Sequence, residues 1–326
     1  MIISRTPFRI SFFGGGTDYP EYYREYGGAT LLTGIDKYCY LSIHPISLLF
    51  KHRFQAHYSK TEQVQAPGEF SHPLIRECLG LLGVDEPMEV SHMADLPGQT
   101  GLGSSSSFTV GLLNALHAWR GDCAPPETLA REAIEVERER VGDSGGHQDQ
   151  YAAAYGGFIR VNFMPGGQVQ IKGLALSPAR MRELEARLLF FYLGTEQSAE
   201  TVVREQKQKT QQNLAALKTM HVMVDRAEDL LAGTGSLDPF GHLLHEAWLL
   251  KKGLSSGISN PAIDRAYEQG MRAGAYGGKL LGAGGRGFMM FYVDPERHDA
   301  VRQAVSDLKE VQIKFSAHGS GIIFNH

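Results

Sequence analysis

The stretch Pro97-Gly98-Gln99-Thr100-Gly101-Leu102-Gly103-Ser104-Ser105-Ser106-Ser107 carries the strongest structural signal in the chain. Its three glycines allow the backbone to approach a ligand closely and to adopt left-handed conformations. The serines precede an apolar pattern with helical spacing, formed by Leu112, Ala115, Leu116 and Trp119. A helix that begins at these serines presents free N–H groups to a phosphate. The alternative is a flexible loop with a serine cap, but four consecutive serines exceed what a cap requires.

Two other nucleotide-binding interpretations fail on context. A Walker loop requires Gly-x-x-x-x-Gly-Lys followed by Ser or Thr, whereas Gly278-Lys279 is followed by leucine. The segment Gly282-Ala283-Gly284-Gly285-Arg286-Gly287 matches the dinucleotide pattern, but the strand-like residues 288–293 follow it where a helix is required. What remains is a glycine-rich loop between two strands. It can pack against a ligand or another loop, or form a tight structural turn.

Two carboxylates stand out by position. Glu137 continues the apolar stripe of a predicted helix that follows Pro125-Pro126. A carboxylate on such a stripe is costly unless it is paired or binds a metal, so a metal ligand, a buried ion pair and a rotated helix all remain open. Asp149 lies at the start of a short predicted helix over residues 148–155. It could cap that helix or act as a base or charge partner for a hydroxyl nucleophile.

Length and composition predict an ordinary globular protein of two domains. The chain has 326 residues, of which 42% are hydrophobic. A net charge of -4 gives no case for nucleic-acid binding. Three widely spaced cysteines without a Cys-x-x-Cys pair suggest neither a disulfide framework nor structural zinc, which fits a cytoplasmic protein. No apolar run approaches the roughly 20 residues needed to span a membrane. The oligomeric state stays open, a homodimer included.

The pattern of elements indicates mixed α and β structure. We place the domain boundary near 175, which gives domains of 1–175 and 176–326. Residues 198–231 read as helical, either one helix or two. The other expected helices cover 105–119, a segment after 125–126, 148–155, 179–187 and 261–273. The expected strands cover 7–13, 38–46, 88–93, 158–163, 169–174, 188–193, 279–281 and 288–293.

Three motifs in order resemble those of the GHMP kinases, the superfamily of galactokinase, homoserine kinase and mevalonate kinase. The glycine-serine loop resembles their central phosphate motif, and residues 279–288 resemble their C-terminal glycine motif. Residues 5–18, Arg-Thr-Pro-Phe-Arg-Ile-Ser-Phe-Phe-Gly-Gly-Gly-Thr-Asp, resemble their N-terminal motif. Arg286 departs from the pattern, because relatives usually have another glycine there.

The resemblance implies an α+β fold, with an N-terminal domain like the second domain of ribosomal protein S5 and a ferredoxin-like C-terminal domain. ATP and a small-molecule sugar would bind between them. The resemblance also implies that Asp149 is the catalytic aspartate, that Arg9 lies beside the transferring phosphate, and that Ser105 and Glu137 are Mg²⁺ ligands. The ATP contacts would be Pro97, Gly98, Gly101, Leu102, Gly103, Ser104, Ser105, Ser106 and Ser107. The sugar contacts would be Gly15, Gly16, Thr17, Asp18, Gly284 and Gly285.

The N-terminal motif narrows the subgroup. Together with Ile35-Asp36-Lys37-Tyr38 and residues 147–153, it resembles the D-glycero-D-manno-heptose kinases of bacterial surface-polysaccharide synthesis. That resemblance implies phosphorylation of the anomeric hydroxyl of the heptose or its 7-phosphate. A fucokinase-like or galactokinase-like enzyme, or a silent sugar and ATP sensor, are the alternatives. A 7-phosphate would need a cationic pocket; Lys37, Lys251 and Lys252 are candidates, although a solvated surface role is the expected one for each.

Overall fold

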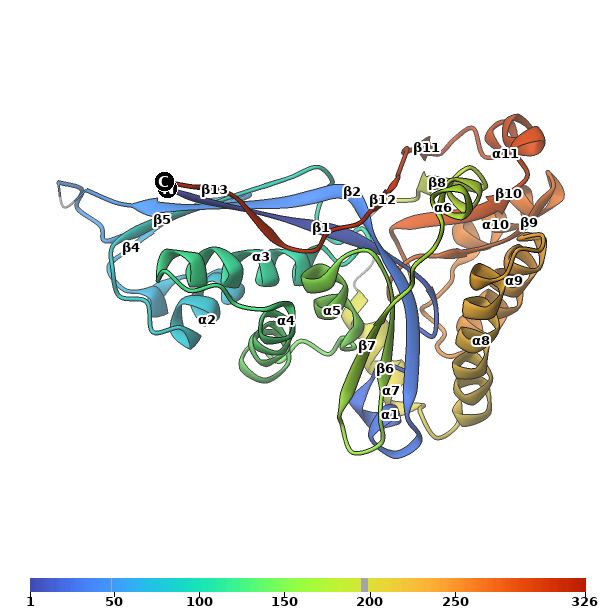
Figure 1. Ribbon diagram of the computed structural model, residues 1–326, viewed down its shortest axis with the longest axis horizontal. Coiled ribbons are helices and arrows are strands. Elements are labelled where there is room, and N and C mark those ends of the chain that lie inside the picture. Colours follow the sequence, from blue (N-terminus) through green and yellow to red (C-terminus); the bar gives the residue numbers. More distant parts are fainter. Residues whose placement is uncertain (48, 195–198) are drawn as a thin grey trace.

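The computed structural model describes residues 1–47, 49–194 and 199–326, and at residues 199 and 200 it describes the backbone alone. Two sheets, each covered by helices, form the left and right parts of the molecule in Figure 1. Within the described residues no helix is both long and apolar enough to cross a bilayer. The described helices and strands therefore confirm the expected α+β fold class.

The larger sheet is organised around two long antiparallel strands, β1 (Ile2–Phe13) and β2 (Gly28–Pro45). One half of β2 pairs with β5 (Met88–Ala94) and the other half with β6 (Phe158–Phe163), so the sheet divides along β2. The second half of β1 is buried throughout. The remaining strands of this sheet are β3 (Phe54–His57), β4 (Thr61–Val64), β7 (Val169–Gly173), β12 (Phe315–Ser316) and β13 (Gly321–Asn325).

Helix α3 (Ser104–Trp119) packs against β1 and β2. The contact is close because Gly111 has no side chain: a Cβ there would lie 2.8 Å from the Thr6 hydroxyl. The hydroxyl of Ser4 donates to the Gly111 carbonyl over 2.7 Å. The other helices of this part are α1 (Pro20–Tyr26), α2 (Pro73–Leu81), α4 (Pro126–Ile134) and α5 (Gln148–Tyr155), with a 3₁₀ turn at Pro67–Glu69.

The smaller sheet is antiparallel, in the order β11 (Lys309–Glu310), β8 (Leu188–Tyr192), β10 (Phe288–Val293), β9 (Ala275–Leu280). Strand β10 is buried over its whole length, as expected of a central strand covered on both faces. The helices of this part are α6 (Pro178–Glu185), α7 (Ala199–Gln208), α8 (Leu214–Ala232), α9 (Asp238–Gly253), α10 (Pro261–Arg272) and α11 (His298–Ala304), with a 3₁₀ turn at Pro295–Arg297.

The structure answers one open question and adds elements that the sequence patterns did not indicate. The segment 198–231 forms two helices, α7 and α8, separated by a turn at 209–213; its residue 198 lies outside the described residues. Helix α9 was not expected, although it buries Trp248 and Lys251. The division of the chain at 175 stays a prediction, but strands β12 and β13 pair with β2 and β1 in the larger sheet.

A glycine substitution tests the packing of α9 on β9. A Cβ on Gly277 would lie 2.1 Å from the Gly241 carbonyl oxygen, a backbone atom that cannot rotate away. We expect Gly277→Ala to lower the free energy of unfolding by about 1–3 kcal/mol, the usual cost of overpacking. Gly253→Ala is the matched control, because open space surrounds that position. Urea denaturation measures both, and equal stabilities would contradict the packing described.

Candidate active site

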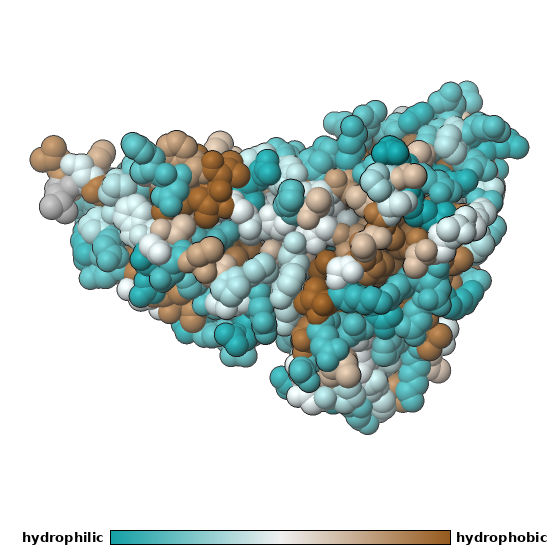
Figure 2. All heavy atoms as spheres, viewed as in Figure 1, coloured by the Kyte–Doolittle hydropathy of each residue, from teal (hydrophilic) through white to brown (hydrophobic). Residues whose placement is uncertain are grey.

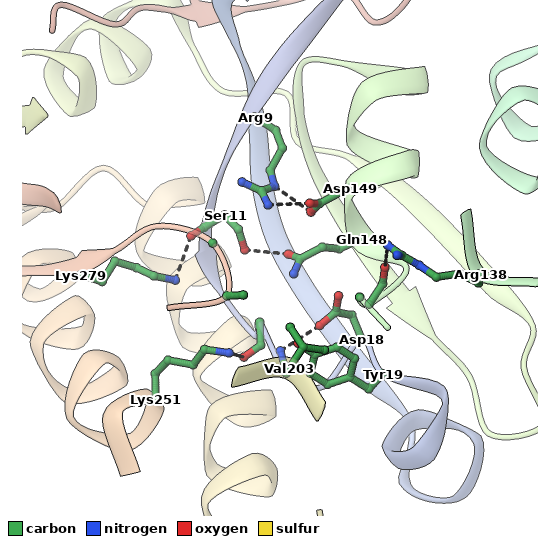
Figure 3. A pocket seen from close by; sticks show the side chains of 16 residues that line it. Arg9, Ser11, Asp18, Tyr19, Arg138, Gln148, Asp149, Val203, Lys251 and Lys279 are labelled. Carbon is green, nitrogen blue, oxygen red and sulfur yellow. Dashed lines mark hydrogen bonds and ion pairs between the residues drawn. The ribbon is translucent and has the colours of Figure 1, made fainter. Parts of the chain in front are cut away.

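A polar cavity lies where the two parts of the molecule meet (Figure 3). Strand β1, the start of α5 and the loop before it supply one side, and α7, α9, β9 and the 281–287 loop supply the other. Its charged lining residues are Arg9, Asp18, Arg138, Asp149, Lys251 and Lys279. Charged groups from both parts of the chain therefore converge on one cavity.

Arg9 and Asp149 form a bidentate ion pair in this cavity (Figure 3). The Arg9 Nε and Nη2 atoms donate to the two carboxylate oxygens over 2.7 and 2.6 Å. The third nitrogen, Nη1, donates to the Gly101 carbonyl oxygen over 2.7 Å. This geometry fixes both planar groups, and it holds Asp149 beside the glycine-serine loop.

The two glycine-rich loops pack backbone against backbone. A Cβ on Gly282 would lie 2.6 Å from the Gly101 Cα atom, and one on Gly287 would lie 2.3 Å from the Thr100 carbonyl oxygen. Arg286 donates to the Gln99 side chain over 2.7 Å and links the same loops. The 282–287 segment is therefore a loop that packs on another loop, one of the alternatives that its sequence left open.

Helix α3 begins at Ser104, directly after Gly103, whose backbone is left-handed with a φ of 78°. The first turn exposes backbone N–H groups that have no partner within the helix. Ser105 is exposed, whereas Ser107 is buried and donates to the carbonyl oxygens of Pro7 and Gly103. The serine run thus combines a free helix end with hydroxyls that fasten the helix to β1.

Glu137 is buried, as the apolar stripe predicted, but it lies in a π-helical turn, Glu135–Arg140, that follows α4. Its Oε2 atom accepts from the Ser106 hydroxyl over 3.0 Å and from Gln150 over 2.5 Å, with Arg138 3.4 Å away. Burial raises the pKa of Glu137. Its Oε1 atom is buried without a partner. An orphaned carboxylate oxygen beside a serine hydroxyl suits Mg²⁺, which takes few protein ligands when phosphates supply the others.

Ser105 as a magnesium ligand stays a prediction, and the contacts of Glu137 bring a second serine into question. The structure places the hydroxyl of Ser106, not that of Ser105, against Glu137. Successive helix residues point in directions about 100° apart, so the rotation of α3 decides which serine faces the carboxylate. In the described chain, no group of three His, Cys, Asp or Glu side chains could hold a metal by itself. A Mg²⁺ here would therefore need nucleotide phosphates as further ligands beside Glu137 and a serine hydroxyl of the run.

Asp18 lines the cavity away from the ion pair of Arg9 with Asp149, and its side chain is almost fully buried. Its Oδ1 atom accepts from the Gly16 backbone N–H over 2.8 Å. A Cβ on Gly146 would lie 1.9 Å from Oδ2, so the loop before α5 closes tightly over the carboxylate. Burial raises the pKa of Asp18 despite the opposing effect of the hydrogen bond from Gly16. A buried acceptor of this kind suits directed hydrogen bonds to a hydroxylated ligand.

Two buried lysines complete the cavity. Lys279, on β9, donates to the carbonyl oxygens of Ser11 and Phe12 over 2.9 and 3.0 Å. Burial, followed by the charges of Lys251 and Arg9, lowers the pKa of Lys279 to about 7. Lys251, on α9, donates to Gln206 over 2.9 Å and to the Gly15 carbonyl oxygen over 3.3 Å. Burial lowers its pKa to about 8.

The structure brings half of the expected sugar contacts to the cavity. Gly15, Gly16 and Asp18 line it. Thr17 is fully buried, and its hydroxyl donates to backbone carbonyl oxygens of Gly14 and Ala29. Gly284 and Gly285 pack instead against Ile258, whereas Gly282 and Ala283 reach the cavity. Thr17, Gly284 and Gly285 therefore serve the local fold in this structure.

Sequence reasoning missed several cavity residues. Lys251 was a candidate for a cationic pocket, with a solvated role as the expected one, but its side chain is buried, with 7% of its surface exposed. Lys252 and Lys37 do form partly exposed ion pairs, with Asp264 and Asp36. Ser11, Gln148 and Arg138 also line the cavity, and Ser11 donates to Gln148 over 2.7 Å. The serine and glutamine lie beside Arg9 and Asp149 in sequence, which was the available signal.

A second groove is apolar and differs in character. Ile171, Leu174, Met181 and Phe315 are among its lining residues, and the described lining contains no acidic or basic side chain. Figure 2 shows hydrophobic surface in this region between the two parts of the molecule. It offers no groups for phosphoryl transfer, so the polar cavity is the candidate active site.

Comparisons with known proteins agree with this assignment. The model of the GHMP kinases N terminal domain matches residues 72–157, and that of the GHMP kinases C terminal region matches residues 227–311. The D-glycero-alpha-D-manno-heptose 7-phosphate kinase of Campylobacter jejuni is 30% identical over 308 residues, which cover 91% of this chain and 90% of that protein. The galactokinase of Pyrococcus furiosus is 28% identical over 68% of both chains.

A solved structure supports the fold. The crystal structure of a D-glycero-D-manno-heptose 1-phosphate kinase from Bacteroides thetaiotaomicron superposes with a TM-score of 0.75 at 25% identity, covering 100% of both chains. The expected GHMP kinase fold is thus confirmed. The two matched regions contain the glycine-serine loop, Glu137, Asp149 and the second glycine loop. The chain belongs to the GHMP kinases, which transfer a phosphoryl group from ATP to a hydroxyl group.

Proposed function

We propose that this kinase phosphorylates the anomeric hydroxyl of D-glycero-D-manno-heptose or of its 7-phosphate, for surface-polysaccharide synthesis. The observation that carries the proposal is the cavity itself. Arg9 holds the Asp149 carboxylate in its wall, and the buried Asp18 lines the same cavity together with backbone groups of Gly15 and Gly16. The similarity to the Campylobacter jejuni heptose 7-phosphate kinase, which covers 91% of this chain, supports this sugar class.

The geometry suggests how the transfer would proceed. The acceptor hydroxyl would lie against Asp149, which takes its proton or stabilises its developing charge. The hydroxyl oxygen forms a bond to the γ-phosphorus, while the bond to the β-γ bridging oxygen breaks and ADP leaves. Arg9 would offset charge on the transferring group, and the N-terminus of α3 would hold the phosphates. A Mg²⁺ bound by Glu137 and Ser106 would neutralise phosphate charge.

Sugar selectivity would come from directed hydrogen bonds. Asp18, the Gly15 and Gly16 backbone and Gln148 present polar atoms on the cavity wall. A site built this way rejects a sugar that lacks a hydroxyl, because buried groups are then left unpaired. The ion pair of Asp149 with Arg9 and the burial of Glu137 also favour an active enzyme over a silent sensor, since a sensor needs neither.

Product analysis tests the proposed reaction. Phosphorus NMR of the product formed from ATP and each heptose should show a phosphate coupled to the anomeric proton. Galactose and fucose serve as competing acceptors and should turn over more slowly. A product phosphorylated at another carbon, or faster turnover of galactose or fucose, would refute the heptose assignment. ATP-dependent thermal stabilisation without turnover of any sugar would favour the sensor.

The role of Asp149 is tested by Asp149→Asn. We expect kcat to fall roughly 10²- to 10⁴-fold, the usual contribution of a positioned base, with a much smaller change in KM for the sugar. Asp122→Asn, at an exposed position, is the matched control and should keep wild-type turnover. Steady-state ADP release gives both constants. A kcat within threefold of wild type would remove Asp149 from the mechanism.

The proposed magnesium site is tested by comparing substitutions of two neighbouring serines. Because Ser106 lies on Glu137 and Ser105 is exposed, we expect Ser106→Ala to raise the magnesium concentration needed for half-maximal activity more than Ser105→Ala does. Magnesium titrations at saturating ATP measure this. The reverse order would favour Ser105, the ligand that the family resemblance implied. Thermal unfolding of both variants shows whether the loss of a buried hydrogen bond accounts for the effect.

A further inference from the structure

Gln99, in the glycine-serine loop, has an unusual backbone conformation. Its φ is 63°, and within residues 1–47, 49–194 and 199–326 no other residue except glycine has a positive φ. A side chain in this left-handed region crowds the following carbonyl oxygen, which is why glycine usually occupies it. Such a conformation persists only where neighbouring contacts hold it. The loop that precedes α3 therefore depends on the contacts that restrain Gln99.

Two hydrogen bonds restrain Gln99. Its backbone N–H donates to the Ser104 hydroxyl over 3.3 Å, and its side-chain oxygen accepts from the Arg286 guanidinium over 2.7 Å. The first bond lies within the loop and is longer than usual, whereas the second has a charged donor and comes from the 281–287 loop. Gln99 is exposed, so burial does not hold it. Arg286 is therefore the main restraint on Gln99 from outside its own loop.

The backbone on both sides of Arg286 is fixed. The Gly285 N–H donates to the Ile258 carbonyl oxygen, and the Gly287 N–H donates to the Gly194 carbonyl oxygen, each over 3.0 Å. A guanidinium carried by such a backbone can hold its partner in one place. The GHMP kinases usually have a glycine at this position, and a glycine has no side chain that could reach Gln99.

The residues directly after Gln99 lead into the start of α3. Thr100 is fully buried, and its carbonyl oxygen packs against Gly287, where a Cβ would lie 2.3 Å away. The Gly101 carbonyl oxygen accepts from Arg9 over 2.7 Å. A Gln99 that relaxed to a negative φ would turn the chain away from these contacts and move the free N–H groups that follow. Because reordering a loop lowers the affinity for its ligand, these groups bind a phosphate best when they are already in place.

We propose that Arg286 is a positioning residue for nucleotide binding: it holds Gln99 in the left-handed conformation and thereby preorganises the glycine-serine loop for the phosphates of ATP. This inference rests on one part of the proposed function, the binding of the phosphates at the start of α3, and not on the identity of the sugar. Arg286 needs no contact with the nucleotide for this role. Its loss should weaken nucleotide binding only while residue 99 carries a side chain.

Isothermal titration calorimetry of the full chain with Mg²⁺ and AMP-PNP, an ATP analogue that is not hydrolysed, tests this without an acceptor. We expect Arg286→Gly to raise Kd roughly 5- to 30-fold, the population lost when a left-handed residue other than glycine is no longer held. Adding Gln99→Gly to Arg286→Gly should restore Kd to within about threefold of wild type, because glycine adopts this φ without strain. Arg272→Gly is the matched control: this exposed arginine of α10 pairs with Glu268, and its loss should leave Kd unchanged.

Each outcome supports or refutes the role of Arg286. An unchanged Kd in Arg286→Gly refutes it. A loss that Gln99→Gly does not restore also refutes it, because Arg286 would then act on the phosphates directly or on the fold in general. Should Arg286→Gly fail to fold, Gln99→Leu removes the acceptor but keeps a side chain at residue 99. The same loss of affinity is then expected, and a wild-type Kd would refute the inference.

The proposed function can fail separately. If neither heptose is phosphorylated at the anomeric carbon, the assignment of the acceptor is refuted, while calorimetry with AMP-PNP still tests Arg286. Wild-type protein that binds no AMP-PNP would refute both.

Discussion

The guanidinium of Arg9 is the interaction on which the candidate active site depends. Its side chain binds both oxygens of Asp149 and the carbonyl of Gly101, and its backbone N–H donates to the Leu102 carbonyl over 2.9 Å. One residue of β1 thereby positions the start of α5 and the glycine-serine loop together. A lysine could not replace it, because a single ammonium lacks the planar fork that holds three acceptors in fixed directions.

The candidate site also depends on a close contact between two glycine-rich loops. The glycine-serine loop and the loop at 281–287 meet through Gly101 and Gly282, where any side chain would push the backbones apart. That contact joins the segment before α3 to the segment between β9 and β10, so both parts of the chain contribute to one cavity. The buried lysines come from α9 and β9, on the same side of the cavity as the 281–287 loop. Both parts of the chain thus supply charged groups to the cavity.

Local patterns in the sequence predicted the features that depend on neighbouring residues. The start of α3, the burial of Glu137 and the end of α5 before Gly156 follow from spacing, capping and glycine positions. Features that depend on distant contacts were not predicted. The rotation that turns Ser106 rather than Ser105 toward Glu137 depends on how α3 sits on β1. The burial of Lys251 depends on α9 packing beside Gly15, and nothing near Lys251 in sequence distinguishes it from Lys252.

The return of β13 to the larger sheet affects how the chain folds as it is synthesised. Strand β1 pairs with β2 on one side and with β13 on the other, although β13 follows every other element in the chain. Until residues 321–325 leave the ribosome, β1 has one unpaired edge, and such edges invite association with other chains. The interval between the synthesis of β2 and that of β13 is therefore the stage at which this edge of β1 is open to association with other chains.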